Sequence, residues 1–308
     1  MLETPNKYRY PKRLGLLVSR LLRGFDLSSP LPALDAALIV VSDIHLSQSA
    51  DERALTLLAL LSEIEKSSVD TFCMLGDIFD FCLGSHPYFQ KKFAPIGAAL
   101  ERVAASGTRV IYLEGNHEFR LKDLPWRGVE VIPNGTTLIP LGNGQIVQAA
   151  HGDMIYSHRR YKTFRYAVKS RFVTGVATLF PGTFLDRLTS KTSEVSRSAD
   201  AYRPIYHEKI LHAVDDWMEK KKDKIEGETH YGIFGHFHVP YAEPRRDLKE
   251  GAVLSVDSWD KPNALVFLRD GISRIWLEGV EKEKWRYESV TPLVRAGLMR
   301  PGYPEIRV

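Results

Sequence analysis

The sequence predicts an α/β domain with a helical insertion, and three observations support this prediction. From residue 36 onward, short β-branched runs alternate with segments whose apolar residues recur at helical spacing. Motifs rich in Asp and His directly follow several of the runs. The composition is that of an ordinary globular protein, with 44% hydrophobic and 26% charged residues among 308. This composition excludes a disordered chain, a collagen-like repeat and a coiled coil.

Each element is expected from its own local pattern. Glu52–Lys66 carries three leucines and an isoleucine at helical spacing, and Phe93–Ala105 is a second helix that Gly107 closes. Asn-Gly pairs at 134–135 and 143–144 mark turns between short strands. The expected strands are 37–42, 71–75, 109–113, 129–133, 137–141, 146–150, 231–234, 252–256, 264–268 and 273–277.

Two basic zones lie outside this alternation and define the expected domains. Residues 1–35 form an amphipathic extension, of which residues 1–30 carry a net charge of +4. Residues 36–280 form the α/β domain, and 281–308 form a C-terminal tail. A mainly helical cap, 154–227, is inserted in the domain, and its residues 154–200 carry a net charge of +6. Basic zones favour anionic partners, so the N-terminal helix either packs on the domain or lies on an anionic membrane surface.

The chain lacks the features of a spanning or secreted protein. Its longest apolar runs, such as Ala36–Val41, hold about six residues, whereas a spanning helix needs roughly 20. Arg20 and Arg23 interrupt the only N-terminal apolar stretch. Cys73 and Cys82 have no metal-type spacing, which is typical of a reducing compartment. We therefore expect a cytoplasmic protein, with the inner face of the cell membrane as its place of peripheral attachment.

Residues of the types that can bind metal ions lie at the ends of the expected strands. Successive strands of an α/β sheet bring such residues to one edge. Apart from His117, they provide two carboxylates, one amide and four imidazoles, about what two metal ions need if one carboxylate is shared. Each motif alone is weak, but five in this order indicate a dinuclear site. The motifs are Asp43-Ile44-His45, Gly76-Asp77, Gly115-Asn116-His117-Glu118, His151-Gly152-Asp153 and Gly235-His236-Phe237-His238.

These blocks resemble the calcineurin-like metallophosphoesterase superfamily, whose signature is Asp-x-His, Gly-Asp, Gly-Asn-His-(Asp/Glu), a later His and Gly-His-x-His. The resemblance implies a two-sheet sandwich flanked by helices, with two divalent ions, commonly Mn²⁺ and sometimes Fe or Zn. It also implies the ligands and the chemistry, in which metal-activated hydroxide attacks phosphorus. One ion would bind Asp43, His45 and His238, the other Asn116, His151 and His236, with Asp77 shared; the catalytic His117 would contact the phosphoryl oxygen or protonate the leaving group.

The insertion is the best clue to the substrate. A basic, aromatic helical cap suits a diphosphate with a lipid tail, and a helical pair packed on the core is the alternative. The cap is similar to the lid of the UDP-2,3-diacylglucosamine hydrolases of lipid A synthesis, as are residues 76–81 and 151–153. This resemblance implies hydrolysis of that nucleotide-linked glycolipid to UMP and a diacylated glucosamine 1-phosphate. Lys191, Ser193 and Arg197 are candidates to bind the substrate, and Asp80 and Asp153 are candidates to support the ligand histidines from behind.

Other functions of the same site stay open. The lidded subfamily typically has Arg and Asp where this chain has His117 and Glu118, so the first alternative is a lidded phosphoesterase with another specificity. A nuclease would use the basic cap to follow a phosphate backbone. The cap's aromatic residues lie on apolar helical faces, so we expect no nucleic-acid partner. A non-catalytic scaffold on the same fold typically loses ligands, and all seven ligand positions are intact.

Overall fold

A computed structural model describes residues 35–133, 135–157, 159–189, 212–214, 216–218, 229–238, 242–244, 251–269, 271–276 and 286–289. The expected N-terminal helix lies outside these residues. Within them, no helix is long and apolar enough to cross a membrane.

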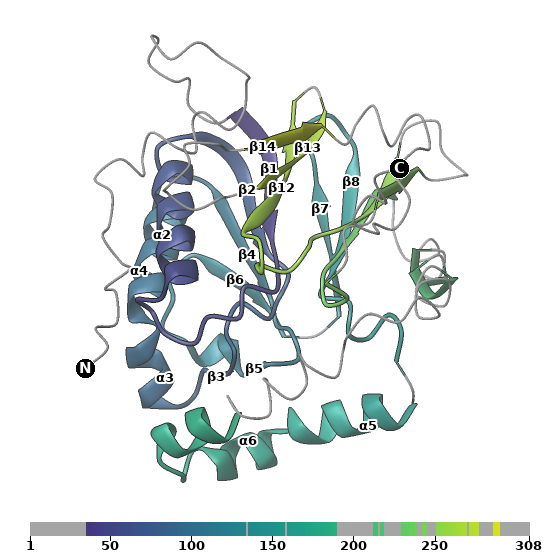
Figure 1. The fold of residues 1–308 in the computed structure, drawn as a ribbon. Coiled ribbons are helices and arrows are strands. Elements are labelled where there is room, and N and C mark those ends of the chain that lie inside the picture. The colour runs from purple at the N-terminus through teal and green to yellow at the C-terminus, as the bar shows by residue number, and fades with distance from the viewer. Residues whose placement is uncertain are drawn as a thin grey trace, which may run out of the picture.

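Two sheets form the centre of the molecule (Figure 1). The seven-stranded sheet has the order β14-β13-β12-β1-β2-β4-β6, and the five-stranded sheet has the order β10-β11-β9-β8-β7. In the first, β1, β2, β4 and β6 run parallel, and in the second β8, β9 and β11 run parallel. The strands of the larger sheet are β1 (Asp35–Val41), β2 (Ser68–Met74), β4 (Arg109–Leu113), β6 (Val129–Ile132), β12 (Asn263–Leu268), β13 (Ile272–Trp276) and β14 (Arg286–Ser289). Those of the smaller sheet are β7 (Thr136–Pro140), β8 (Ile146–Ala150), β9 (Thr229–Phe234), β10 (Ala242–Pro244) and β11 (Ala252–Ser255).

Strand β1 shows why the larger sheet is covered on both faces. Its residues are buried from Ala36 to Val41, and they alternate between two apolar clusters. Leu38 and Val40 pack between the two sheets, whereas Ile39 and Val41 pack beneath the helices. Such a strand reads as a continuous apolar run because neither face meets water.

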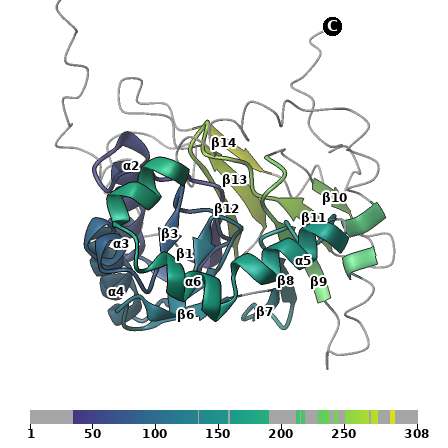
Figure 2. The ribbon, with the colours of Figure 1, turned by 90° about the horizontal axis from the view of Figure 1, so that it is seen from below.

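Helices cover the outer face of the larger sheet (Figure 1). They are α2 (Glu52–Ile64), α3 (Pro87–Lys92) and α4 (Ala94–Ala105). Asp51 caps α2 by accepting a hydrogen bond from the Ala54 N–H at 2.7 Å, which satisfies one of the free donors of the first turn. The cap helices α5 (Arg159–Val168), α6 (Arg171–Ala177) and 182–189 run across one end of the strands (Figure 2).

The sequence predictions find the long elements and miss the short ones. Strands β4 and β8 have the expected bounds, and α2 ends two residues before the expected end. The missed elements are the paired strands β3 (Cys82–Leu83) and β5 (Glu118–Phe119), the 3-10 helix η1 (Leu121–Asp123), α3, β10 and β14. Four of these six elements, β3, β5, η1 and β10, hold only two or three residues, which is too few to show a period. Strand β14 lies in the segment expected as a tail, where it pairs with β13.

Candidate metal centre

The five sequence motifs converge at the carboxyl ends of parallel strands. Asp43 and His45 follow β1, Asp77 follows β2, and Asn116 and His117 follow β4. The second sheet adds His151 after β8, and His236 and His238 after β9. The hydrogen bond from the Gly235 N–H to the His151 carbonyl, 2.8 Å long, joins the loops of this second sheet. The apolar cluster between the two sheets holds their strand ends together, so residues almost 200 positions apart meet at one place.

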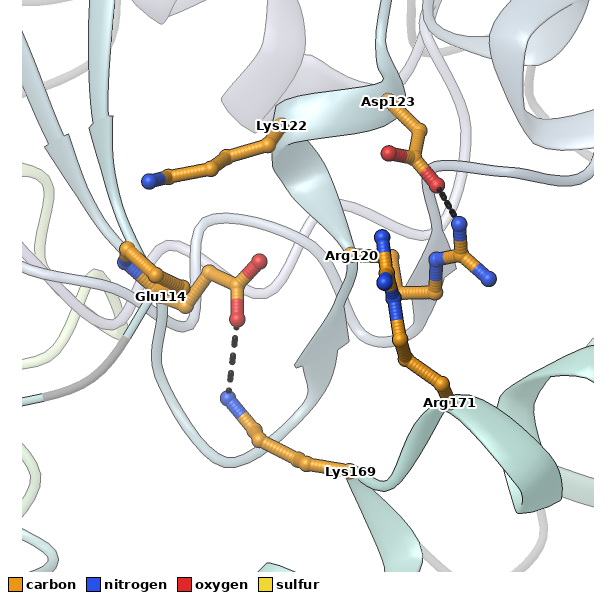
Figure 3. Close-up of a pocket in the computed structure, with 7 residues that line it drawn as sticks. Glu114, Arg120, Lys122, Asp123, Lys169 and Arg171 are labelled. Carbon is orange, nitrogen blue, oxygen red and sulfur yellow. Dashed lines mark hydrogen bonds and ion pairs between the residues drawn. The ribbon is translucent and has the colours of Figure 1, made fainter.

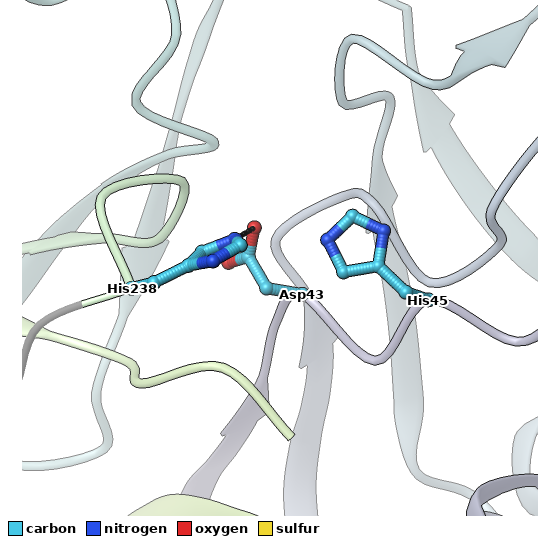
Figure 4. A group of neighbouring side chains, drawn as sticks. All are labelled: Asp43, His45 and His238. Atoms are coloured by element: carbon cyan, nitrogen blue, oxygen red, sulfur yellow. Dashed lines mark hydrogen bonds and ion pairs between the residues drawn. The ribbon is translucent and has the colours of Figure 1, made fainter. Parts of the chain in front are cut away.

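Asp43, His45 and His238 form one group with metal-ligand geometry (Figure 4). One ligand atom from each lies within 4.8 Å of the others. The His238 Nε2 atom lies 3.2 Å from Asp43 Oδ1, and Asp43 Oδ2 accepts hydrogen bonds from the Ser42 hydroxyl at 2.5 Å and the His236 N–H at 2.9 Å. These bonds fix the carboxylate that the resemblance assigns to the first ion.

Asp77, His151 and His236 form a second group of the same dimensions. The His151 Nδ1–H donates to the Leu75 carbonyl at 2.7 Å, which turns Nε2 toward Asp77 Oδ2 at 3.5 Å and Asn116 Oδ1 at 3.0 Å. Asp77 also belongs to a third group, with His45 and His117. Its carboxylate is therefore the only one among the described residues that occurs in more than one such group.

His117 lies beside both groups with one nitrogen directed by its neighbours. Its Nδ1 is 2.8 Å from the Asp80 carbonyl, an acceptor, so Nδ1 carries a proton. Nε2 then points to the centre, 3.8 Å from Asp77 Oδ2. In the neutral ring Nε2 is an acceptor, and in the protonated ring it is a donor. His117 can thus either donate a proton or ligate an ion.

The backbone of the centre is held in an uncommon conformation. Asp43, His45, Asp77, His236 and His238 all have a φ between 49° and 68°, the left-handed region that residues with a side chain rarely enter. Each such residue costs about 1–3 kcal/mol, and such residues cluster at functional sites. The surrounding hydrogen bonds, such as the one from the His45 N–H to the Asp77 carbonyl at 3.0 Å, keep these loops in place.

Two glycines are required by close approach to the ligands. A Cβ atom on Gly115 would lie 2.1 Å from Asp77 Oδ1, and one on Gly235 would lie 2.4 Å from Asp43 Oδ2. Real Cβ contacts are essentially never shorter than 3.0 Å. Glycine at these two positions therefore keeps side chains away from the ligands.

Glu118 fastens the two loops that carry Asp77 and Asn116, a role that the sequence did not reveal. The side chain is fully buried and accepts hydrogen bonds from four backbone N–H groups, those of Asp77, Ile78, Phe79 and Gly115, at 2.7–3.2 Å. The Tyr112 hydroxyl adds a fifth at 2.5 Å. The only sequence signal was an acidic residue directly after the Asn-His pair.

Burial and the neighbouring charges shift the pKa values of the centre in opposite directions. Burial raises the pKa of Asp43, but the hydrogen bond and charge of His238 outweigh it and lower that pKa below the usual range. Burial lowers the pKa of His151, whereas the charge and hydrogen bond of Asp77 raise it, with a net rise to about 10. Burial dominates at His45 and His236, and lowers both pKa values to about 4. Without a metal ion the centre thus holds a proton on His151.

The residues fit a bound metal ion. Both ring nitrogens of His45 are buried and have no hydrogen-bond partner among the described residues, although Asp80 Oδ1 lies 3.7 Å from Nδ1. Buried polar atoms without a partner are rare and require an explanation, such as an ion that the structure does not contain. Mixed imidazole and carboxylate donors suit Mn, Fe and Zn ions better than Ca or Mg. An ion between Asp43, His45 and His238 would give the His45 ring its missing partner.

The cap is attached to the loops that carry the ligands. Arg165 of α5 pairs with Asp153, and both side chains are at most 5% exposed. Four residues later, the Lys169 ammonium donates to the Gly115 carbonyl at 2.7 Å and lies 3.3 Å from Glu114 Oε2. The Lys92 ammonium holds Asp186 of the 182–189 helix at 2.6 and 2.7 Å.

The structure describes two of the five residues expected to support the ligands or bind the substrate. Asp80 Oδ1 lies 3.7 Å from His45 Nδ1, and the Asp80 carbonyl accepts a hydrogen bond from His117. Asp153 pairs with Arg165 and accepts a hydrogen bond from Tyr161 at 3.2 Å, and both of these residues belong to the cap. Lys191, Ser193 and Arg197 lie outside the described residues.

The comparison with known proteins decides the family. A family model described as calcineurin-like phosphoesterase matches residues 37–251. The chain belongs to this family. The match confirms the expected fold class and the class of metal-dependent phosphoesterases. The family is dimetal-dependent, and the His and Asp groups described above could bind the metal ions.

Curated relatives are named for one substrate. A UDP-2,3-diacylglucosamine hydrolase of Azotobacter vinelandii is 27% identical over 239 residues, which cover 71% of this chain and 94% of that protein. One from Neisseria meningitidis serogroup B is 25% identical, over 53% of this chain and 68% of that protein. Among solved structures, a dimetal phosphatase from Danio rerio is 11% identical with a TM-score of 0.39, and the match covers 83% of this chain and 99% of that one.

Proposed function

We propose that this phosphoesterase hydrolyses the diphosphate of UDP-2,3-diacylglucosamine to UMP and a diacylated glucosamine 1-phosphate. The observation that carries the proposal is the structure of the cap. Charged side chains attach it to the loops of the metal centre, and its outer surface is apolar. In the part of the cap that the structure describes, nine large apolar residues are exposed, among them Phe172 at 79% and Leu179 at 83%. The names of the relatives support the same substrate.

In this proposal Asp43, His45 and His238 hold one divalent ion, and Asn116, His151 and His236 hold the other, with Asp77 shared. Mn²⁺ is the expected metal. When bound, such ions supply a hydroxide near neutral pH and neutralise charge on phosphorus. The residues of the chain bind the ions and keep the site in shape. Glu118 and the left-handed backbone keep the ligands in place before substrate arrives, which lowers the reorganisation needed in the reaction.

His117 has the role of proton donor. Because its Nδ1–H is engaged by the Asp80 carbonyl, the protonated ring directs Nε2–H into the centre. There it can donate to a phosphoryl oxygen or to the departing phosphate. General acid catalysis of this kind contributes about 10²–10⁴-fold. We expect His117→Gln to lose activity by that factor and to retain its metal content, because none of the seven expected ligands changes.

The test is a substrate comparison on purified, Mn²⁺-loaded protein. UDP-2,3-diacylglucosamine, bis-p-nitrophenyl phosphate and single-stranded DNA are supplied side by side, and UMP release is measured for the first. The proposal predicts that the glycolipid is hydrolysed far faster than the generic diester. Equal or slower hydrolysis of the glycolipid contradicts the substrate and leaves the metal chemistry intact. Rapid, salt-sensitive cleavage of DNA would instead favour the nuclease alternative.

A further inference from the structure

A cavity lies between the cap and the core, and none of the seven expected metal ligands lines it. Its volume is about 180 Å³. The core contributes Glu114, Arg120 and Lys122, and the cap contributes Lys169 and Arg171 from the end of α5 and the start of α6 (Figure 3). The cavity is therefore a place where a ligand would contact both parts of the molecule.

The cavity carries more positive than negative charge. Four cationic side chains and two carboxylates, Glu114 and Asp123, line it. Asp123 pairs with Arg120 at 2.5 Å, and Glu114 pairs with Lys169 at 3.3 Å. The remaining cations, Lys122 and Arg171, have no ion pair among the described residues. The charged side chains that line the cavity thus sum to a net charge of +2.

The two arginines give this charge a geometry suited to phosphate. They come from opposite walls, Arg120 from the core and Arg171 from the cap, and their side chains extend into the same cavity (Figure 3). A guanidinium has five N–H donors, and Asp123 engages one end of Arg120 only. Arginine forks match the oxygens of a phosphate in pairs. Two like charges that share a small cavity repel each other, and an anion between them removes this repulsion.

Arg120 is also held in an uncommon conformation. Its φ is 54°, in the left-handed region, although it is neither a glycine nor one of the expected metal ligands. Arg120 directly precedes η1, whose Lys122 lines the same cavity. Non-glycine residues in this region are associated with functional sites, and here the associated feature is the basic cavity.

The surface beside the cavity indicates where the phosphate comes from. Phe172, the residue after Arg171, is 79% exposed, and Val173 and Val176 on the same helix are 41% and 42% exposed. Apolar side chains next to a phosphate site are the arrangement expected for a lipid whose headgroup is anionic. A soluble phosphate compound would need the basic cavity and not the apolar residues.

We propose that this cavity, lined by Arg120, Lys122, Lys169 and Arg171, is a second anion site that binds a phosphate group and links cap to core. A phospholipid headgroup and a free phosphate compound share this chemistry, and the apolar surface of α6 favours the headgroup. The site is distinct from the metal centre and does not depend on the substrate proposed above.

Equilibrium dialysis of Mn²⁺-loaded protein against radiolabelled inorganic phosphate tests the site. The variant is Lys122→Glu/Arg171→Glu, which changes two exposed residues. The control is Lys91→Glu/Arg127→Glu, which makes the same change of charge on exposed residues elsewhere. We expect the variant to bind one phosphate fewer per chain than wild type, or to bind it at least about tenfold more weakly, and the control to match wild type. Circular dichroism of both variants checks their folding.

Equal phosphate binding by wild type and variant overturns the proposal. The variant keeps all seven expected metal ligands, so a phosphate bound at the metal centre would be retained by wild type and variant alike. Failure of the proposed catalytic centre would therefore not be mistaken for failure of this site. Co-sedimentation with phosphatidylglycerol vesicles distinguishes a phospholipid headgroup from a free phosphate compound. Phosphatidylcholine vesicles are the neutral comparison. Loss of phosphatidylglycerol binding in the variant supports the headgroup. Loss of phosphate binding with unchanged vesicle binding supports the site and assigns it to a soluble phosphate compound.

Discussion

Alanine at position 115 would displace the Asp77 carboxylate, which belongs to two of the three ligand groups. The added Cβ would lie 2.1 Å from Asp77 Oδ1 and 2.5 Å from Asp77 N, and real contacts are essentially never below 3.0 Å. Asp77 or its loop must therefore move by about 0.9 Å. Gly115 has no left-handed φ, so the substitution acts through this contact and not through backbone strain. A misplacement of about 1 Å can cost roughly 10²-fold in rate.

The assay is Mn²⁺-dependent hydrolysis of bis-p-nitrophenyl phosphate, with metal affinity measured on the same samples. We expect Gly115→Ala to lose about 100-fold in kcat/KM and to bind Mn²⁺ more weakly. Gly142→Ala is the matched control, because its Cβ would meet nothing closer than Arg269 Nη1 at 3.8 Å. Wild-type activity and metal affinity in Gly115→Ala would refute the reasoning that Asp77 must sit where the structure places it.

Two further predictions concern the cap and the protons of the centre. Arg165→Met leaves the buried Asp153 without its cation, so the free energy of unfolding in urea should fall by about 3 kcal/mol; adding Asp153→Asn should cost less than the sum of the two single changes. Full additivity would show that the pair is not coupled. Because the pKa of His151 is raised to about 10 without metal, Mn²⁺ must displace its proton, and the apparent affinity should rise about tenfold per pH unit between pH 7 and 9. Calorimetry in two buffers of different ionisation enthalpy counts the released protons, and pH-independent binding contradicts the prediction.

The strand-end motifs could be predicted because their signal is local and repeated. The apolar run of β1 identifies a buried strand, and parallel strands bring their carboxyl ends together whatever their distance in the chain. Asp43 and His238 could therefore be assigned to one site from sequence.

The support of the site could not be predicted, because it depends on contacts between distant segments. Glu118 reaches the Asp77 loop about 40 residues away, and nothing in the sequence shows which backbone groups it will meet. Asp153 was expected behind a ligand histidine, whereas Arg165 pairs with it once α5 is in place. The basic cavity combines Lys122 and Arg171, whose proximity follows only from the docking of the cap on the core.

Metal content measured by inductively coupled plasma mass spectrometry tests the central claim most directly. Wild type, Asp77→Asn and the surface variant Asp260→Asn are loaded with Mn²⁺, freed of excess metal and compared. Asp77 belongs to two of the three groups of metal-binding residues, whereas Asp260 pairs with Arg53 and is in none of them. The dinuclear centre predicts two ions per chain in wild type and in Asp260→Asn, and fewer than two, with loss of hydrolysis, in Asp77→Asn. Two ions and full activity in Asp77→Asn, or fewer than two ions in wild type, would contradict it.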